Sequence, residues 1–141
     1  MAFVGYEELK GLVSEFVSAA KRFCSPYVNA QAAGSQAAEA FFVAPAACKV
    51  VRAKESHTTA EASAGTLTID IVKDASGNAP GTSTTSVLAA TFDGKGAANT
   101  PQAQDGASGN QLAAGDRLTF KPSAAGTELT GVIITVELEY V

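Results

Sequence analysis

The stretch ELTGVIITVELEYV, residues 128–141, carries the most regular apolar alternation in the chain. Read in steps of two, one face is apolar and the other is mostly polar: Val132, Ile134, Val136, Leu138 and Tyr140 against Ile133, Thr135, Glu137 and Glu139. This period is typical of a β-strand that is buried on one face. We therefore expect the chain to end on a core strand, and the rest of the fold to be built around it.

Further strand-like segments begin at residue 39. The segment TLTIDIVK places Leu67, Ile69 and Ile71 on one face, and Gly/Pro-rich turns such as 74–83 separate the segments. The predicted strands cover residues 39–44, 48–56, 66–73, 85–92, 117–120 and 132–140, with short strands near 97–102 and 110–112 in the weakly patterned region between. This spacing of roughly six to eight short strands predicts a mainly β fold, an antiparallel β-sandwich.

An amphipathic helix is predicted over residues 6–23. Apolar residues recur at helical spacing and form one face: Leu9, Leu12, Val13, Phe16, Val17 and Ala20. Acidic residues lie in the first turn and basic ones in the last, which suits the helix dipole. Ser25-Pro26 is expected to end the helix, because the residue before a proline avoids the α region.

The segment after this helix, residues 29–38, is small and polar and reads as a linker or extended arm. We therefore divide the chain into an N-terminal helix and arm, 1–38, and a β-sandwich domain, 39–141. The apolar face of the helix packs either on its own sandwich or on a partner. For the second case the predicted partner-binding residues are Phe3, Val4, Tyr6, Leu9 and Phe16.

The charge and the distribution of apolar residues argue against nucleic-acid binding, a membrane helix and secretion. The net charge is −4, from 10 basic and 14 acidic residues, and no basic stripe suits a phosphate backbone, so nucleic-acid binding is not expected. No apolar run approaches the roughly 20 residues of a membrane helix. The start MAFVGYEELK lacks the apolar core of a secretory signal. We expect a soluble protein made in the cytoplasm.

The residues that carry chemistry are sparse. The one histidine, His57, is expected on a surface loop, and its neighbours Glu55 and Ser56 do not form a nucleophilic triad with it. Cys24 and Cys48 lack metal or redox spacing, and we favour two buried free thiols, with a disulfide as the alternative. The carboxylates fit outward strand positions and turns. We expect no enzymatic activity, no cofactor and no metal.

A resemblance to a known family covers the second half of the chain. The stretches GTLTIDIVKDASGNAPGTSTTSVLAATFDGKGAANTPQ, NQLAAGDRLTF and AGTELTGVIITVELEYV resemble small structural proteins of tailed bacteriophages, namely capsid decoration or cement proteins and related head or tail appendages. The resemblance implies a jelly-roll-like sandwich that binds the outer capsid surface between capsomers, often as a trimer. It implies the major capsid protein as partner, location on the virion after synthesis in the host cytoplasm, and no catalytic residues.

The first functional hypothesis is therefore a decoration protein that stabilises the capsid shell as a homotrimer. The alternative is a receptor- or glycan-binding module of a phage head or tail fibre. Sugar sites usually offer exposed aromatic platforms, whereas this chain has no Trp and its Tyr residues, Tyr6, Tyr27 and Tyr140, are scattered. Decoration predicts many copies per particle, and a receptor module predicts few.

Overall fold

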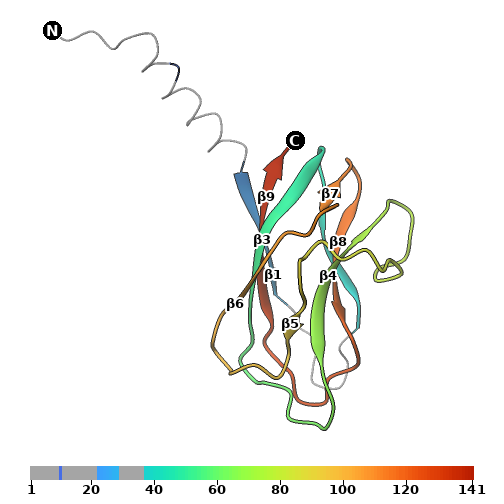
Figure 1. Ribbon diagram of the computed structural model, residues 1–141. Coiled ribbons are helices and arrows are strands. Elements are labelled where there is room, and N and C mark those ends of the chain that lie inside the picture. The colour runs from blue at the N-terminus through green and yellow to red at the C-terminus, as the bar shows by residue number, and fades with distance from the viewer. Residues whose placement is uncertain (1–9, 11–21, 29–36) are drawn as a thin grey trace, which may run out of the picture.

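The computed structural model describes Lys10, residues 22–28 and residues 37–141. Within these residues the chain forms strands that build two antiparallel sheets (Figure 1). The strands are β1 (Arg22–Val28), β2 (Glu39–Val43), β3 (Cys48–Ser56), β4 (Thr68–Asp74), β5 (Phe92–Asp93), β6 (Gln102–Asp105), β7 (Gln111–Leu112), β8 (Arg117–Pro122) and β9 (Ile133–Tyr140). The predicted mainly β fold is therefore confirmed, and the strand beyond the predicted six to eight is β1, which lies in the region assigned to the N-terminal helix and arm.

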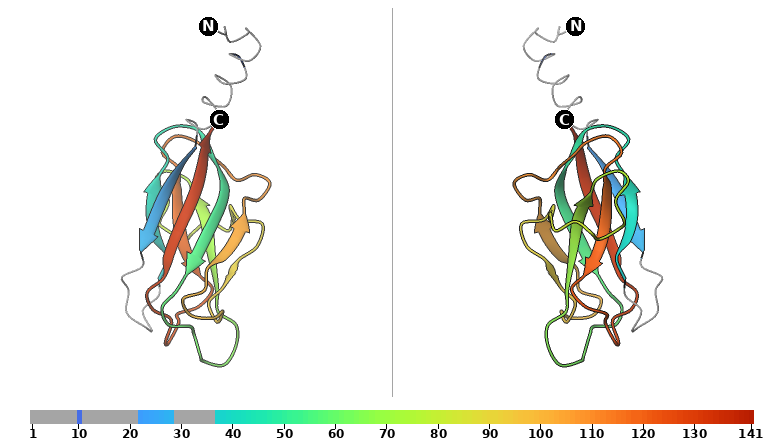
Figure 2. Two further views of the ribbon diagram at one scale, coloured as in Figure 1. Left: turned by 90° about the vertical axis from the view of Figure 1, so that its left-hand side faces the viewer. Right: turned by 90° about the vertical axis from the view of Figure 1, so that its right-hand side faces the viewer.

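The two sheets lie face to face. Sheet A has the order β1-β9-β3-β6, with β7 also paired to β3, and sheet B has the order β2-β8-β4-β5. Figure 2 turns sheet A toward the viewer on the left and sheet B on the right. The C-terminal strand β9 lies between β1 and β3, so the segment with the strongest alternation occupies an interior position of its sheet.

The core lies between the sheets. The predicted inward residues of the last segment, Val132, Ile134, Val136 and Leu138, are fully buried. Sheet B contributes a matching apolar face: Ile69, Ile71, Phe92, Leu118 and Phe120. Burying one such side chain stabilises a fold by roughly 1.5–3 kcal/mol, so these two faces account for much of what holds the sheets together.

Strand β1 corrects the predicted end of the N-terminal helix. Arg22 and Phe23, expected as its last residues, begin a strand that pairs with β9 from Arg22–Glu139 to Val28–Ile133. Residues 6–9 and 11–21 of that prediction lie outside the described residues. A proline is tolerated in β1 because the strand is an edge of sheet A and pairs on one side only. The predicted arm 1–38 therefore includes a strand of the sandwich.

The predicted strand 85–92 is also corrected, because the chain leaves sheet B halfway. Val87 donates its backbone N–H to Ile71 in sheet B, 3.0 Å, and its carbonyl accepts from Ala107, 2.9 Å. Ala89 then donates to Asp105 of sheet A, 2.9 Å. These hydrogen bonds connect the two sheets along one side. Of the predicted strand 85–92, only its last residue, Phe92, lies in a strand, β5.

The region between β5 and β8 matches its prediction in part. The short strand expected near 110–112 is confirmed as β7, whereas the strand expected near 97–102 lies at β6, Gln102–Asp105. The predicted bounds of β3 are confirmed.

The two ends of the sandwich have different contents. At one end, called the Tyr140 end, β1 begins, β9 finishes, and residues 44–47 connect β2 to β3. At the other end, called the Glu61 end, β3 and β9 meet the loops 57–67 and 123–132. Figure 1 shows the C-terminus beside the start of β1.

Candidate functional site

The residues predicted to bind a partner lie outside the described residues. Phe3, Val4, Tyr6, Leu9 and Phe16 therefore stay predictions. The structure does fix where their segment joins the sandwich. Arg22 pairs with Glu139, one residue from Tyr140, so residues 1–21 connect to the fold at the Tyr140 end.

An apolar surface lies at this same end, and we call it the terminal patch: Phe23, Phe42, Val43, Tyr140 and Val141. Phe23 stacks on Tyr140 with ring centroids 4.6 Å apart and contacts Phe42 at 6.0 Å. Val43 is 60% exposed, Tyr140 37% and Val141 70%. Tyr140, predicted to face inward, therefore takes part in the surface. Three of the four large exposed hydrophobic residues among those described are gathered here.

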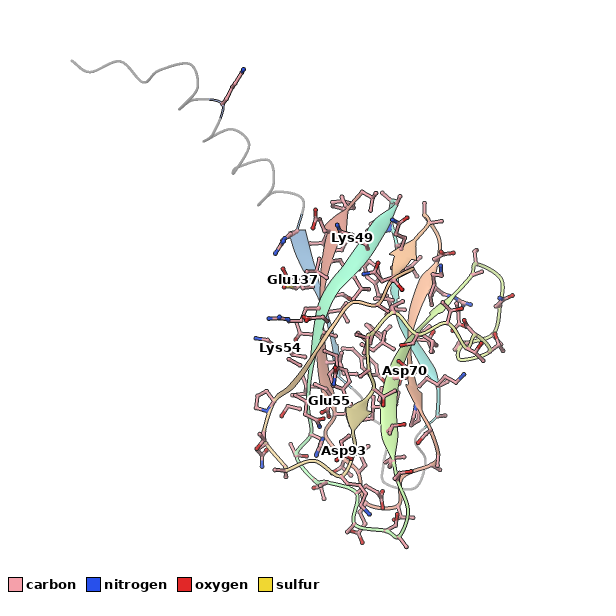
Figure 3. All side chains as sticks on the ribbon, viewed as in Figure 1. Lys49, Lys54, Glu55, Asp70, Asp93 and Glu137 are labelled. Carbon is pink, nitrogen blue, oxygen red and sulfur yellow. The ribbon has the colours of Figure 1, made fainter. Side chains whose placement is uncertain are left out.

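Next to the terminal patch, the outer face of sheet A carries a pattern of alternating charge. Glu137 and Glu139 of β9 lie between basic residues of β1 and β3. Arg22 contacts Glu137 at 2.9 Å and Glu139 at 3.9 Å, and Lys49 lies 3.7 Å from Glu139. Figure 3 shows Lys49, Lys54 and Glu137 on this side of the molecule. Exposed pairs of this kind contribute little stability, so the pattern is a polar surface beside an apolar one.

His57 is buried, which corrects its predicted place on a surface loop. It is 1% exposed, and its Nδ1 lies 2.8 Å from Oε1 of Glu55, which is also 1% exposed. Its Nε2 lies 2.9 Å from the carbonyl oxygen of Gly96. Gln102 donates to the second oxygen of Glu55 at 3.1 Å. Figure 3 places Glu55 between the sheets, near Asp93.

This geometry fixes the proton count of the pair. The Gly96 carbonyl can only accept, so Nε2 of His57 carries a hydrogen. One further proton lies between Nδ1 and Oε1, and either location leaves the pair with no net charge. Burial raises the pKa of the Glu55 carboxyl, and the hydrogen bond from His57 opposes that shift. The pair ties β3 to the loop around Gly96, which is a structural role.

Glu61 is a second buried carboxylate and joins two loops at the Glu61 end. Its Oε1 accepts from the backbone N–H of Ser63 at 2.9 Å and from Thr127 Oγ1 at 2.8 Å. Its Oε2 accepts from the backbone of Glu128 at 3.1 Å. Hydrogen bonds from Ser63 and Glu128 hold the pKa of Glu61 well below its usual range. The carboxylate thus adds to the backbone pairing of Thr59 with Thr130, which also joins loops 57–67 and 123–132.

Asp74 is the third buried carboxylate, and it lies on the outer side of sheet B. It accepts from Thr119 Oγ1 at 2.6 Å and from the backbone N–H groups of Gly81 and Ser83 at 2.7 and 2.9 Å. Burial alone would raise the pKa of Asp74, but these hydrogen bonds outweigh it and hold the pKa below the usual value. Asp74 therefore folds the loop 75–83 over Thr119, which is fully buried for that reason.

The two cysteines are free and differ in environment. Cys48 is fully buried, whereas Cys24 is exposed, so the expected pair of buried thiols is correct for Cys48 and wrong for Cys24. Burial, and after it the charge of Asp116, raises the pKa of the Cys48 thiol.

The buried ionisable side chains are thus engaged in holding loops and strands. Within residues 22–28 and 37–141, together with Lys10, no group of three or more potential metal ligands comes together. In the same residues no helix has the length and hydropathy needed to cross a membrane.

No protein-family model matches the chain, and no curated protein matches it either.

Sequence reasoning missed the terminal patch, because its members come from three strands that are distant in the chain. It also missed the roles of Glu61 and Asp74. A weak signal existed for Glu55 and His57, which are two positions apart and therefore share a face of a strand.

Proposed function

We propose that this protein is a structural protein of a tailed-bacteriophage virion, which binds the outer capsid surface between capsomers and stabilises the shell. The proposal joins the sequence resemblance to one structural observation, the terminal patch at the end where residues 1–21 enter the sandwich. Exposed apolar side chains gathered in one place are typical of an interaction surface. The partner is the major capsid protein, and the assembled form is a homotrimer of jelly-roll-like sandwiches.

In this proposal the predicted partner-binding residues of the N-terminal segment act together with the terminal patch. Arg22, the first residue of β1, pairs with Glu139 beside the patch, so the predicted segment precedes the patch directly in the chain. Fully burying a Val side chain contributes roughly 1.5–3 kcal/mol, and the patch residues are partly buried already, so one such contact is weak. Weak contacts suffice for a cement protein, because bridging several subunits at once multiplies their effect.

The buried polar groups also favour a structural role. Glu55, His57, Glu61 and Asp74 are hydrogen-bonded within the fold and largely withdrawn from solvent. A catalytic acid or base must reach its substrate within hydrogen-bonding distance. Their engagement therefore supports a protein that works through its surface.

The test compares attachment of four purified proteins to shells of the cognate phage that lack this protein. They are the wild type, a deletion of residues 2–21, the Val43→Ser/Val141→Ser double variant, and Ile133→Ser as a control. Ile133 is 47% exposed and lies at the opposite end of β9, which makes the control comparable in chemistry. Circular dichroism first establishes that each variant is folded. The deletion stops at residue 21 because β1 begins at Arg22.

We expect the wild type and Ile133→Ser to co-sediment with the shells and to raise the temperature at which they break. We expect the deletion and the double variant to lose most of the bound protein. A Phe16→Asp variant should bind less for the same reason as the deletion. If the folded deletion and the folded double variant both bind like the wild type, or if the wild type does not bind at all, the proposal is wrong.

A further inference from the structure

The outer face of sheet B contains a groove that has no part in the attachment described above. Its volume is about 280 Å³, and it lies between the exposed side of β4, the end of β8 and the segment 84–91. Six of its lining residues define its chemistry: Thr68, Asp70, Thr84, Thr91, Lys121 and Pro122. None of them belongs to the terminal patch. Figure 3 marks Asp70 on β4.

Asp70 presents one occupied and one available oxygen. Its Oδ1 accepts from the backbone of Ile71 at 2.8 Å and from Ser86 Oγ at 2.7 Å. These two bonds fix the orientation of the carboxyl group. Among the described residues, nothing donates a hydrogen bond to Oδ2. The groove therefore holds a positioned acceptor with a free oxygen.

Three threonines line the same groove as this acceptor. Among the described residues, the side-chain hydroxyls of Thr68, Thr84 and Thr91 make no hydrogen bond, and Thr84 and Thr91 are exposed. Lys121 donates one N–H to the carbonyl of Ser83 at 2.7 Å and keeps two further donors. The lining of the groove thus combines hydrogen-bond donors and acceptors with the apolar ring of Pro122.

These properties select one class of ligand. The negative charge of Asp70 and the positive charge of Lys121 cancel. The groove therefore favours neither an anion such as phosphate nor a cationic amine. One carboxylate is too few for a calcium site, which takes six to eight oxygen ligands. An apolar ligand would leave the threonine hydroxyls and Asp70 unpaired, which costs binding free energy. A neutral ligand with several hydroxyl groups satisfies all of them.

We propose that this groove binds a carbohydrate, one sugar ring at a time. Adjacent hydroxyls of the ring donate to Oδ2 of Asp70, the threonine hydroxyls and Lys121 contact the remaining ring oxygens, and the C–H face of the ring lies on Pro122. The volume falls just below the range of about 300–1,000 Å³ for drug-sized ligands, which suits a single ring. Without an aromatic platform the affinity for a monosaccharide is weak.

The test is a titration of the full chain with galactose, glucose, mannose and N-acetylglucosamine, followed by saturation-transfer NMR and calorimetry. The first variant is Thr84→Val/Thr91→Val, which keeps side-chain shape and removes two hydroxyls. The second is Asp70→Asn, which keeps an oxygen for Ile71 and Ser86 and replaces Oδ2 with a donor. The control is Thr135→Val, an exposed threonine on the outer face of sheet A.

We expect at least one of the four sugars to bind saturably, and each groove variant to weaken it by at least about fivefold, the effect of losing one or two hydrogen bonds. Thr135→Val should bind like the wild type. The proposal is overturned if none of the four sugars binds, or if both groove variants bind as the wild type does. Because the groove and the terminal patch share no residue, neither result depends on whether the protein attaches to a capsid.

Discussion

Nδ1 of His57 lies 2.8 Å from Oε1 of Glu55 in the interior of the sandwich, and both side chains are almost completely buried. Burying two polar side chains costs little free energy only while each is hydrogen-bonded to the other. The two other buried carboxylates among the described residues, Glu61 and Asp74, likewise accept hydrogen bonds from more than one donor.

Replacing Glu55 with Leu should destabilise the fold by about 1–3 kcal/mol, because His57 and Gln102 lose their buried partner. Glu55→Gln should cost less, since its amide can donate to Nδ1 of His57 and accept from Gln102. Urea unfolding followed by circular dichroism measures both. Equal stability of the Leu variant and the wild type would show that the pair contributes nothing.

Acid should weaken the fold through Glu61 and Asp74. Both carboxyls have a lowered pKa when folded, the first through bonds from Ser63 and Glu128 and the second because bonds from Thr119, Gly81 and Ser83 outweigh burial. The unfolded chain therefore binds protons more tightly. The stability from these groups is present above the ordinary carboxyl pKa of about 4 and is lost as pH falls through the folded pKa values.

The measurement is the urea midpoint of unfolding between pH 7 and pH 2. The Glu61→Gln/Asp74→Asn double variant should be less stable at pH 7 and should lose less stability on acidification. An acid-side slope as steep as that of the wild type would contradict the assignment.

Glu55 should act in the opposite sense. Burial raises the pKa of its carboxyl, so its contribution is present below the ordinary pKa and is lost as pH rises through the folded pKa. The Glu55→Gln variant should therefore lose less stability than the wild type when pH is raised from 4 to 8. The same urea series provides the comparison, and parallel curves would exclude this role.

Gly81 and Gly77 provide a matched pair for backbone strain and steric contact. Both have a positive φ, 75° and 90°, but a Cβ at Gly81 would lie 2.3 Å from Cβ of Ala38, whereas a Cβ at Gly77 meets nothing within 4 Å. Gly77→Ala should cost about 1 kcal/mol from the left-handed backbone alone. Gly81→Ala should cost clearly more. Thermal unfolding distinguishes them, and equal losses would mean that the loop moves to relieve the contact.

The cysteines should react one at a time. In the folded protein a thiol reagent such as dithionitrobenzoate should modify Cys24, which is exposed, and leave Cys48, which is buried. In denaturant both should react. Cys24→Ser should abolish the rapid reaction, and a rapid reaction that survives in this variant would place Cys48 at the surface.

The sequence predicted those parts of the fold in which alternation is long and unbroken. Residues 132–138 show this best, because a half-buried strand needs an apolar side chain at every second position. Strand β3 shows the limit. A bulge shifts its register between Val50 and Arg52, so Ala53 and Glu55 face inward after Cys48 and Val50 do. The charged side chains of Arg52 and Lys54, two positions apart, were the available sign in the sequence that Ala53 and Glu55 face inward.

Other parts depended on contacts between distant segments. The first two residues of β1, Arg22 and Phe23, were assigned to the end of a helix because a helical spacing of apolar residues runs up to them, and Ser25-Pro26 was taken as the stop of that helix. The edge position of β1 and its pairing with β9 decide otherwise. The segment 85–92 alternates like a strand but crosses to sheet A through Ala89. The terminal patch and the groove both join residues from several strands, so neither leaves a local pattern.

The antiparallel pairing of β1 with β9 also has a mechanical consequence. Arg22 lies at the Tyr140 end and Val28 toward the Glu61 end, so tension between the chain before Arg22 and the far end of the body runs along β1. The hydrogen bonds to β9 then carry the force together, in shear. Pulling in an optical trap between residues 21 and 62 should therefore need a larger force than pulling between residues 21 and 141, where the same bonds open one after another from the loaded end.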